Sequence, residues 1–516
     1  MSGAPNARLG RWAWRPAPED GGRDYGNANA YATPAALPTL VRETIQNSLD
    51  AAIKSRNITL RYSLIEVSKH SQEYEEIENA LDIKSLRAHA VAASQMGQKF
   101  GDRLTAGLAE MEAAETLTLL RIEDFGTTGL VGEDHVHGSV TNPFTAFVRN
   151  NLDSSKDTAG AGGSFGLGKA ASWTCSNLFT VAIATEPNER PTDAIGELRF
   201  IAKSELSWHS HDGVPYAGPG WLSHHDHEFA SIWTSRDSLK SIFLDRSALP
   251  KNVSEGEQTG TSLLIVGFHD PSLDGPPEGS RIVENLVKAA AQNFWPAIVN
   301  GRLTVHVEHI SDGRHVSAQQ VSPEDHVPEL VEAYQAYQKG NVVHDGAHPG
   351  VTILRTIPLE IMPTKSGQTN VKALSERLKV DAHLVVRIAN RNTSQSEKQK
   401  SEIALIRGRN MVVKYLDRGI AALSGYTFHG MLLAGTAAED AANATDAEAF
   451  LRLAEPPAHD AWEYTPALKN VYESGTGARL REFFQSLTDA LREITQPENS
   501  GTDIGPVELR SLLKVA

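Results

Sequence analysis

The segment that most constrains this chain is residues 43–54, where a helical pattern carries polar side chains on one side. Glu43, Asn47 and Asp50 follow one another at spacings of four and three residues, so they share one face of a helix. The other face is apolar, with Leu40, Ile45, Leu49 and Ile53. A surface helix with a polar stripe is the plain interpretation. The alternative is a magnesium–nucleotide site, in which the acid polarises a water and the amide oxygen binds the cation.

A second polar signal stands at the end of a predicted strand. Residues 116–123 form a largely apolar run, and Asp124 follows it, with Gly126 and Gly129 close behind. A buried carboxylate can accept a hydrogen bond from an exocyclic amine such as that of adenine, and glycine lets the backbone pass close to the ring. The structural alternative is a turn that ends the strand and is capped by the aspartate.

A third signal is the glycine-rich run Gly-Ala-Gly-Gly-Ser-Phe-Gly-Leu-Gly-Lys at residues 160–169, which leads into a predicted helix. Free backbone N–H groups at the start of a helix favour phosphate. The run is not a P-loop, because its spacing differs and Ala170 stands where Ser or Thr would bind magnesium. It predicts a phosphate cradle of another kind, or else a flexible glycine loop. Gly260-Thr261 opens a later strand and adds little alone.

Composition excludes several classes of protein. The net charge of −15 does not indicate nucleic-acid binding, although a local basic groove would permit it. Cys175 is the only cysteine, which excludes an intrachain disulfide or a thiolate cluster and suits a reducing cytoplasm. The chain shows no apolar signal region, and no apolar run approaches the ~18–20 residues of a membrane span. We therefore expect a cytoplasmic protein with no membrane partner.

Histidines gather between residues 209 and 227 without matching a known pattern of metal ligands. We therefore interpret residues 205–230 as a solvated loop. The remaining alternation of strands and helices indicates an α+β fold with two layered domains and a helical tail. Strands are expected at 58–68, 116–123, 178–185, 261–268, 302–309, 351–357, 382–389 and 402–408.

The motifs, in this order, resemble those of the GHKL or Bergerat-fold ATPases, which include gyrase, heat-shock chaperones, histidine kinases and MutL. Glu43 through Ala51 matches the family's first motif, Glu-x-x-x-Asn-x-x-Asp-Ala, at every fixed position. Lys54 extends the likeness towards the heat-shock chaperones. Histidine kinases generally carry Asn where this chain has Glu43, so the resemblance favours hydrolysis over kinase chemistry.

The later motifs extend the resemblance over about residues 25–270. Asp124 and Gly126 match Asp-x-Gly-x-Gly, although two threonines precede Gly129 where one residue is usual. Thr261 fits the family's late strand threonine. The third motif, Gly-x-x-Gly-x-Gly, is met by Gly163, Gly166 and Gly168.

The resemblance implies a role for each of these residues. Glu43 would be the general base that orients the attacking water, and Asn47 would hold Mg²⁺. Asp124 would bind the adenine amine, with Thr261 behind it. Further contacts to ATP are implied for Asp50, Lys54, Gly126, Thr128, Gly129, Gly163, Ser164, Phe165, Gly166, Leu167, Gly168 and Lys169.

The family's architecture implies a Bergerat-fold ATP-binding sandwich, in which a mixed sheet carries helices on one face. A transducer-like α/β domain and a helical C-terminal region would follow. We expect an arm at 1–36, the ATP-binding domain at 37–270 with a two-helix insertion at 70–115 and a lid at 126–168, the transducer-like domain at 271–440, and the helical region at 441–516. Transducer domains send a cation to the γ-phosphate, and here the resemblance favours Lys365 over Arg407, Arg409 and Lys414.

The function implied is that of an ATP-gated clamp that dimerises on ATP binding, hydrolyses ATP with Mg²⁺ and controls a separate effector protein or nucleic acid. The nearest members in style are stand-alone bacterial MORC-like and chaperone-like ATPases, which implies a role in antiviral defence against phage. The arm at 1–36 would cross to the partner subunit. Three alternatives stay open: a MutL- or gyrase-like DNA repair or topology protein, a molecular chaperone, and a nucleotide sensor that does not hydrolyse ATP.

Overall fold

The computed structural model describes residues 8–23, 36–54, 56–96, 98–134, 142–150, 167–192, 194–271, 278–346, 348–368, 371–389, 401–417, 427–438, 443–456 and 460–495. The chain forms two compact units. The first comprises Met1–Val327, Arg409–Met411 and Glu455–Ala461, and the second comprises Pro328–Gly408, Val412–Ala454 and Trp462–Ala516. Each unit combines a mixed sheet with helices, which confirms the expected α+β class.

The first unit is built on one sheet with the order β1-β7-β5-β4-β9-β3-β2-β10-β11, while β6 pairs with β7 and β8 with β5. β10 is parallel to β2, and the other neighbours along this path are antiparallel. β2 and β4 are buried along nearly their whole length, as expected for inner strands rich in aliphatic residues. The strands are β1 (Arg11–Pro16), β2 (Ile58–Ser68), β3 (Thr116–Phe125), β4 (Ser176–Glu186), β5 (Leu198–Ser204), β6 (His209–His211), β7 (Val214–Ser223), β8 (Ile232–Thr234), β9 (Gly260–Phe268), β10 (Leu303–Ser311) and β11 (Arg314–Gln320).

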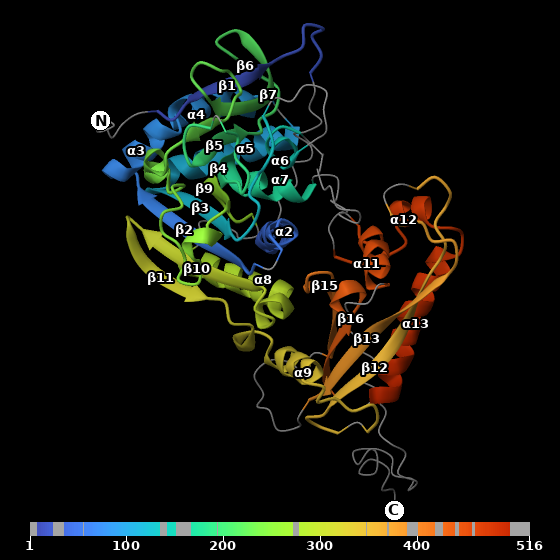
Figure 1. The fold of residues 1–516 in the computed structure, drawn as a ribbon. Coiled ribbons are helices and arrows are strands. Elements are labelled where there is room, and N and C mark those ends of the chain that lie inside the picture. Colours follow the sequence, from blue (N-terminus) through green and yellow to red (C-terminus); the bar gives the residue numbers. More distant parts are fainter. Residues whose placement is uncertain are drawn as a thin grey trace, which may run out of the picture. The chain divides into compact units, whose positions relative to one another are not determined.

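Helices pack against this sheet. They are α2 (Leu37–Asp50), α3 (Gln72–Ala80), α4 (Ile83–Ser94), α5 (Gln98–Ala113), α6 (Pro143–Val148), α7 (Leu167–Thr174) and α8 (Gly279–Val299). α2 lies beside α7 and α8 and also touches β2 (Figure 1). Its buried apolar residues recur with the helical period and fix which face meets the core: Leu37, Leu40, Val41, Ile45 and Leu49.

The opening helix is shorter than the range 37–55 that its sequence pattern predicts. It ends at Asp50, because the Ala52 N–H bonds to Leu49 O, three residues back, and Ala52 forms a β-bridge with Thr127. The insertion at 70–115 contains three helices, α3 to α5, where two were expected. A turn at Asp82, whose φ is +45°, separates α3 from α4.

The first unit extends beyond the boundary that we placed at residue 270. β10 pairs with β2 from Leu303 opposite Ile58 to Ser311 opposite Glu66. A parallel pair needs a crossover connection, and α8 immediately precedes β10 on its return to the sheet. The segment taken as the start of a transducer domain therefore completes the first sheet, and the first unit continues to Val327.

The N-terminal segment and the histidine-rich region also differ from expectation. β1 lies within the presumed arm and pairs with β7 of its own chain, Trp14 opposite Gly220. A Cβ on Gly220 would lie 2.4 Å from the Trp14 ring, so the absent side chain makes room for the indole. β6 and β7 occupy residues 209–223 of the expected loop, where Gly218, Pro219 and Gly220 obscured the strand pattern.

The second unit has a five-stranded sheet within the described residues, in the order β12-β13-β16-β14-β15. Its strands are β12 (Thr352–Ile361), β13 (Leu378–Ile388), β14 (Glu402–Arg407), β15 (Met411–Asp417) and β16 (Phe428–Leu433). Its helices are α9 (Pro328–Gln338), α11 (Ala444–Leu453), α12 (Pro466–Val471) and α13 (Thr476–Thr495). α13 packs on β12 (Figure 1), so the helical C-terminal region belongs to this unit. Across the described ranges, no helix is both long and apolar enough to cross a membrane.

Candidate functional site

The polar face of α2 borders a cavity of about 100 Å³ in the first unit. Glu43 is only 8% exposed, whereas Asn47 is exposed on the cavity wall. The ends of β3 and β9, the loop after β3, and α6 and α7 supply the remaining walls. The lining residues are Glu43, Thr44, Asn47, Ser48, Ala51, Ile122, Asp124, Thr127, Gly129, Leu130, Phe147, Ser172, Thr261 and Leu263.

Three donors hold the side chain of Asp124 at this cavity. Its Oδ2 accepts a hydrogen bond from Ser48 Oγ at 2.8 Å. Its Oδ1 accepts from Thr127 Oγ1 and from the backbone N–H of Thr261, each at 2.8 Å. Burial raises the pKa of Asp124, while Arg246 and these hydrogen bonds act in the opposite direction. The donors fix the carboxylate as an acceptor at the cavity.

The start of β9 approaches Asp124 so closely that only glycine fits. Gly260 has a φ of +154°, and a Cβ there would lie 2.3 Å from Asp124 O and 2.4 Å from Asp124 Oδ1. Thr261 therefore reaches Asp124 directly through its backbone N–H. The Thr261 hydroxyl lies 3.1 Å from that of Thr185, whose Oγ1 also accepts from the N–H of Leu130. These two contacts of Thr185 join β4, β9 and the loop after β3 at one corner of the cavity.

The extra threonine in the second motif has a defined place. Thr127 lines the cavity and bonds to Asp124, whereas Thr128 is absent from the lining and its hydroxyl donates to Gly129 O. The Thr128 N–H donates to Ala51 O, which ties the loop to the end of α2. Gly129 has a φ of +66°, and a Cβ there would lie 2.9 Å from Thr185 Oγ1. The cavity contact implied for Thr128 thus falls on Thr127.

Glu123 stabilises the other side of β3, directly behind the site. Its side chain is fully buried, and its carboxylate lies 2.6 Å from Arg61 and 3.1 Å from Arg121. Burial raises the pKa of Glu123, but Arg121 and Arg61 outweigh it and lower the pKa overall. Ser262 Oγ donates to the same carboxylate at 3.1 Å. Glu123 and Asp124 are adjacent on β3, yet the pKa of Glu123 is lowered and that of Asp124 is raised.

Several residues implied by the motifs are not brought to the cavity wall in the described part of the chain. Asp50 and Lys54 lie at and beyond the C-terminal end of α2, and Gly126 lies one residue before Thr127. Leu167, Gly168 and Lys169 form the first turn of α7, but their side chains fall outside the description. Gly163, Ser164, Phe165 and Gly166 lie outside the described residues. Of the lid expected at 126–168, residues 126–134, 142–150 and 167–168 are described.

Lys365 belongs to the second unit, where its N–H donates to Val471 O and its Nζ contacts Lys469 O. Arg407 is buried, and its guanidinium lies 3.0 Å from Glu448 Oε1. That ion pair removes Arg407 from the candidates for a cation that reaches a phosphate, because breaking a buried pair is costly.

Sequence reasoning missed Thr44, Ser48, Thr127 and Thr185. Ser48 follows Asn47 and lies one helical turn after Thr44, so the face of α2 already contained the signal. Thr127 is the first of the two threonines before Gly129 in the second motif, and the resemblance implied no contact for it. Thr185 had no signal, because it lies in an ordinary buried strand and acquires its role only through pairing with β9.

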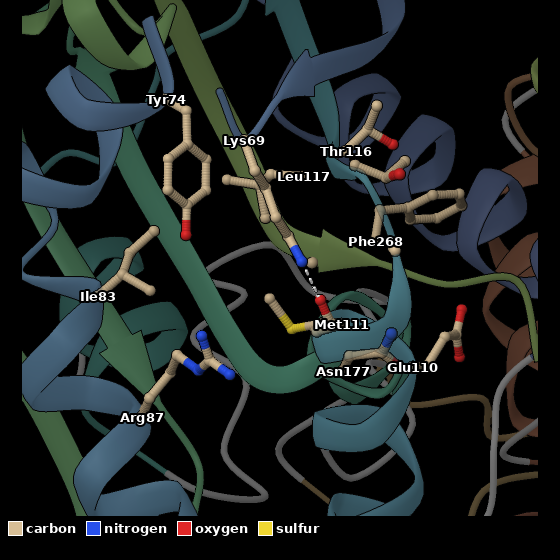
Figure 2. A pocket seen from close by; sticks show the side chains of 13 residues that line it. Lys69, Tyr74, Ile83, Arg87, Glu110, Met111, Thr116, Leu117, Asn177 and Phe268 are labelled. Atoms are coloured by element: carbon tan, nitrogen blue, oxygen red, sulfur yellow. Dashed lines mark hydrogen bonds between the residues drawn. The ribbon is translucent and has the colours of Figure 1, made fainter. Parts of the chain in front are cut away.

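A second cavity, of about 40 Å³, lies beside α3, α4 and α5 (Figure 2). Lys69 donates from Nζ to Met111 O across it, and Tyr74, Arg87 and Asn177 point towards it. At ~10–15 Å³ of such volume per water, it holds only a few waters. None of the residues implied by the motifs lines it, so the candidate site is the cavity at α2.

The first histidine of the histidine-rich region, His209, is packed in the interior and not solvated. His209 is fully buried, and its Nε2 lies 2.9 Å from His89 Nδ1. Trp14 stacks on His89 with ring centroids 4.3 Å apart. Burial, with His209 and His211 nearby, lowers the pKa of His89 to about 3, and burial also lowers the pKa of His209. The neutral form is therefore favoured for both rings. Among the residues described, no cluster of three or more His, Cys, Asp or Glu is arranged to hold a metal ion.

The comparisons with known proteins give distant likenesses only. No model of a protein family matches the chain. No curated protein matches it in sequence. Among solved structures, the N-terminal domain of a DNA repair protein is similar with a TM-score of 0.30 and 10% identity, over 90% of this chain and 97% of that one.

Two structures of the ATPase region of Saccharomyces cerevisiae topoisomerase II are similar at 7% identity. The one bound to ICRF-187 (dexrazoxane) has a TM-score of 0.27 over 77% of this chain and 73% of that one. The other has a TM-score of 0.29 over 88% and 85%. Likenesses this distant carry no conclusion about the activity of this chain.

Proposed function

We propose that the first unit is a magnesium-dependent ATP site that hydrolyses its nucleotide. The observation that carries the proposal is the setting of Asp124. A carboxylate has roughly four lone-pair positions. Three are used by Ser48, Thr127 and the backbone of Thr261. The remaining acceptor position suits an amine donor in the cavity, such as the exocyclic amine of adenine.

Glu43 and Asn47 supply the second half of the proposal from the α2 wall of the same cavity. Both offer side-chain oxygens, which suit Mg²⁺, a hard cation that prefers oxygen ligands. Asn47 would hold the ion, and Mg²⁺ would neutralise charge on the phosphates when bound. Glu43 would orient and deprotonate the attacking water. The residues of the third motif, Gly163 to Lys169, would contact the phosphates through their backbone.

The output that we propose is mechanical. ATP binding would bring two first units together, and hydrolysis would release them, so that the chain acts as a switch on an effector protein. Lys365 of the second unit would supply a cation to the γ-phosphate. Lys365→Ala is then expected to lower turnover at saturating ATP without weakening ATP binding. An unchanged turnover would remove Lys365 from the proposal. The role in antiviral defence rests on the motif resemblance alone.

The proposal is tested by phosphate release from ATP by the purified full chain, with Mg²⁺ and with EDTA. Slow turnover that depends on Mg²⁺ is expected, because domain motions limit many enzymes of this kind. ATP binding without phosphate release would favour the nucleotide sensor. The absence of both would contradict the proposal. Binding to duplex DNA that falls steeply with salt would instead favour the DNA repair or topology alternative.

A further inference from the structure

Arg246 is a buried cation beside the candidate site that no sequence motif pointed to. It is 1% exposed and lies in the segment before β9. Its Nη2 donates to two backbone carbonyls, Asp124 O and Gln258 O, each at 2.7 Å. Its Nη1 donates to Ser262 Oγ, also at 2.7 Å. The guanidinium carbon lies 4.5 Å from the centre of the Phe125 ring.

This residue is costly to the fold in two independent ways. The backbone of Arg246 has a φ of +54°, the left-handed region that residues other than glycine seldom adopt. Its Nε is buried with no hydrogen-bond partner among the described residues. Strained backbone and unpaired buried donors persist where the surrounding structure over-determines them, and they gather at functional sites. Both costs fall here on the residue that touches the backbone of Asp124.

Arg246 lies where the hydrogen-bond ladder between β3 and β9 ends. The ladder between β3 and β9 ends at the pair Glu123 and Ser262, one residue before Asp124. Gly260 has no Cβ because one would lie 2.3 Å from Asp124 O and 3.0 Å from Arg246 Nη2. At the end of the ladder, the guanidinium spans the two strands and binds an acceptor on each. Between these contacts, the backbone N–H of Thr261 donates to Asp124 Oδ1.

We propose that Arg246 is a positioning residue for the nucleotide site, which holds Asp124 and the start of β9 in the geometry that accepts the amine of the base. The inference rests on the proposed function, because it names what orients the carboxylate of that site. Arg246 does not line the cavity. It acts on the ligand only through Asp124 and Thr261. Loss of the guanidinium should therefore weaken binding of the base more than it slows chemistry at the γ-phosphate.

The test compares Arg246→Met and Arg246→Lys with wild type in the steady-state hydrolysis of ATP by the full chain. For Arg246→Met we expect KM for ATP to rise roughly tenfold or more while kcat at saturation stays within about threefold. Arg246→Lys keeps the charge, but one ammonium cannot reproduce the planar fork that reaches acceptors on two strands. Arg246→Lys should therefore give an intermediate KM. If Arg246→Met fails to fold, the comparison of Arg246→Lys with wild type still tests the inference.

Arg121→Met is the matched control. Like Arg246, Arg121 is a buried arginine, but it lies on β3. Its partners are Ser63, Phe243 O and the carboxylates of Glu123 and Glu308. It should lower the unfolding temperature and leave KM unchanged. A wild-type KM in a folded Arg246 variant would overturn the inference, as would an equal rise in KM for Arg121→Met. A wild-type chain that neither binds nor hydrolyses ATP overturns the proposed function, and the inference falls with it.

Discussion

At the scale of single residues, the candidate site places two carboxylates, Asp124 and Glu43, in different surroundings, and the proposed function gives them different roles. Asp124 is held as an acceptor by three donors, including the backbone of Thr261. Glu43 lies on the opposing element, α2, on the same cavity. Such separation of roles by environment is how enzymes assign an acid, a base and a binding group from one residue type.

The first prediction concerns Glu43. In Glu43→Gln the side chain keeps its size and its oxygen, but it can no longer take a proton from water. We expect ATP to bind within about threefold of wild type while turnover falls by roughly a hundredfold or more, the scale of general-base catalysis. Calorimetry measures the binding and phosphate release measures the turnover. Glu75→Gln, an exposed position on α3, should change neither. Hydrolysis by Glu43→Gln at the wild-type rate would show that the base lies elsewhere.

The second prediction concerns pH. Because burial raises the pKa of Asp124, this carboxylate takes up a proton at a higher pH than an ordinary aspartate. The protonated group is a poorer acceptor, so affinity for ATP should fall on acidification before ordinary aspartates titrate. Fluorescence titration of an ATP analogue across pH measures this. A flat affinity down to the ordinary aspartate range would contradict the assignment.

The linkage to stability has opposite signs for these two neighbours. The raised pKa of Asp124 means that its ionised form disfavours folding, a penalty that disappears below its unfolded pKa. The lowered pKa of Glu123 means that it contributes stability above its unfolded value of 4.5, and this contribution is lost as pH falls through the folded value. Acid unfolding of the first unit should therefore reflect Glu123 and its arginines rather than Asp124.

At the scale of elements, the site depends on how closely the start of β9 approaches the end of β3. Gly260→Ala would place a Cβ 2.3 Å from Asp124 O, a contact with backbone that cannot move aside. We expect a loss of about 2 kcal/mol or more in unfolding free energy, together with weaker ATP binding. Gly213→Ala is the matched control, since its φ is +79° but an added Cβ meets nothing within 4 Å. It should cost about 1 kcal/mol from backbone strain alone and leave ATP binding unchanged. Equal effects in chemical denaturation and calorimetry would refute the close approach.

The sequence predicted the elements that carry a strong period and missed those with turn residues inside them. The β2, β3, β4 and β9 strands were expected, because each is a run of apolar and β-branched residues. β7 was missed, because Gly218, Pro219 and Gly220 interrupt its pattern. Contacts with other segments explain the two glycines, since a Cβ on Gly220 would meet the Trp14 ring of β1 and one on Gly218 would meet Leu206 O. For the same reason Arg246 and Thr185 were invisible in the sequence. Their roles arise from contacts between segments far apart in the chain.

At the scale of the whole molecule, the boundary between the two units lies further along the sequence than the composition suggests. The Pro- and Gly-rich segment at 270–280 reads as a linker, yet α8 and β10 return to the first sheet. Pairing in parallel with β2 is a long-range property that local composition does not report. The sequence therefore predicted the presence of two α+β units but placed the boundary too early.

The whole-molecule prediction concerns assembly. If ATP gates association, the Glu43→Gln chain should gain mass when ATP and Mg²⁺ are added, because the bound state cannot be hydrolysed. Analytical ultracentrifugation at several protein concentrations measures this. Wild type with ADP is the control and should sediment as the nucleotide-free chain does. A mass that is unaffected by ATP at concentrations that saturate binding would remove the dimerising clamp from the proposal.

The central claim is that Asp124 binds the exocyclic amine of an adenine base, and calorimetry of ATP and GTP with wild type and Asp124→Asn tests it most directly. Loss of a charge-assisted hydrogen bond should weaken ATP binding by roughly 10- to 100-fold. Asp102→Asn, at an exposed position on α5, should bind ATP as wild type does. We predict that wild type binds ATP more tightly than GTP and that Asp124→Asn loses this preference. An Asp124→Asn protein that binds ATP with wild-type affinity and preference would contradict the account.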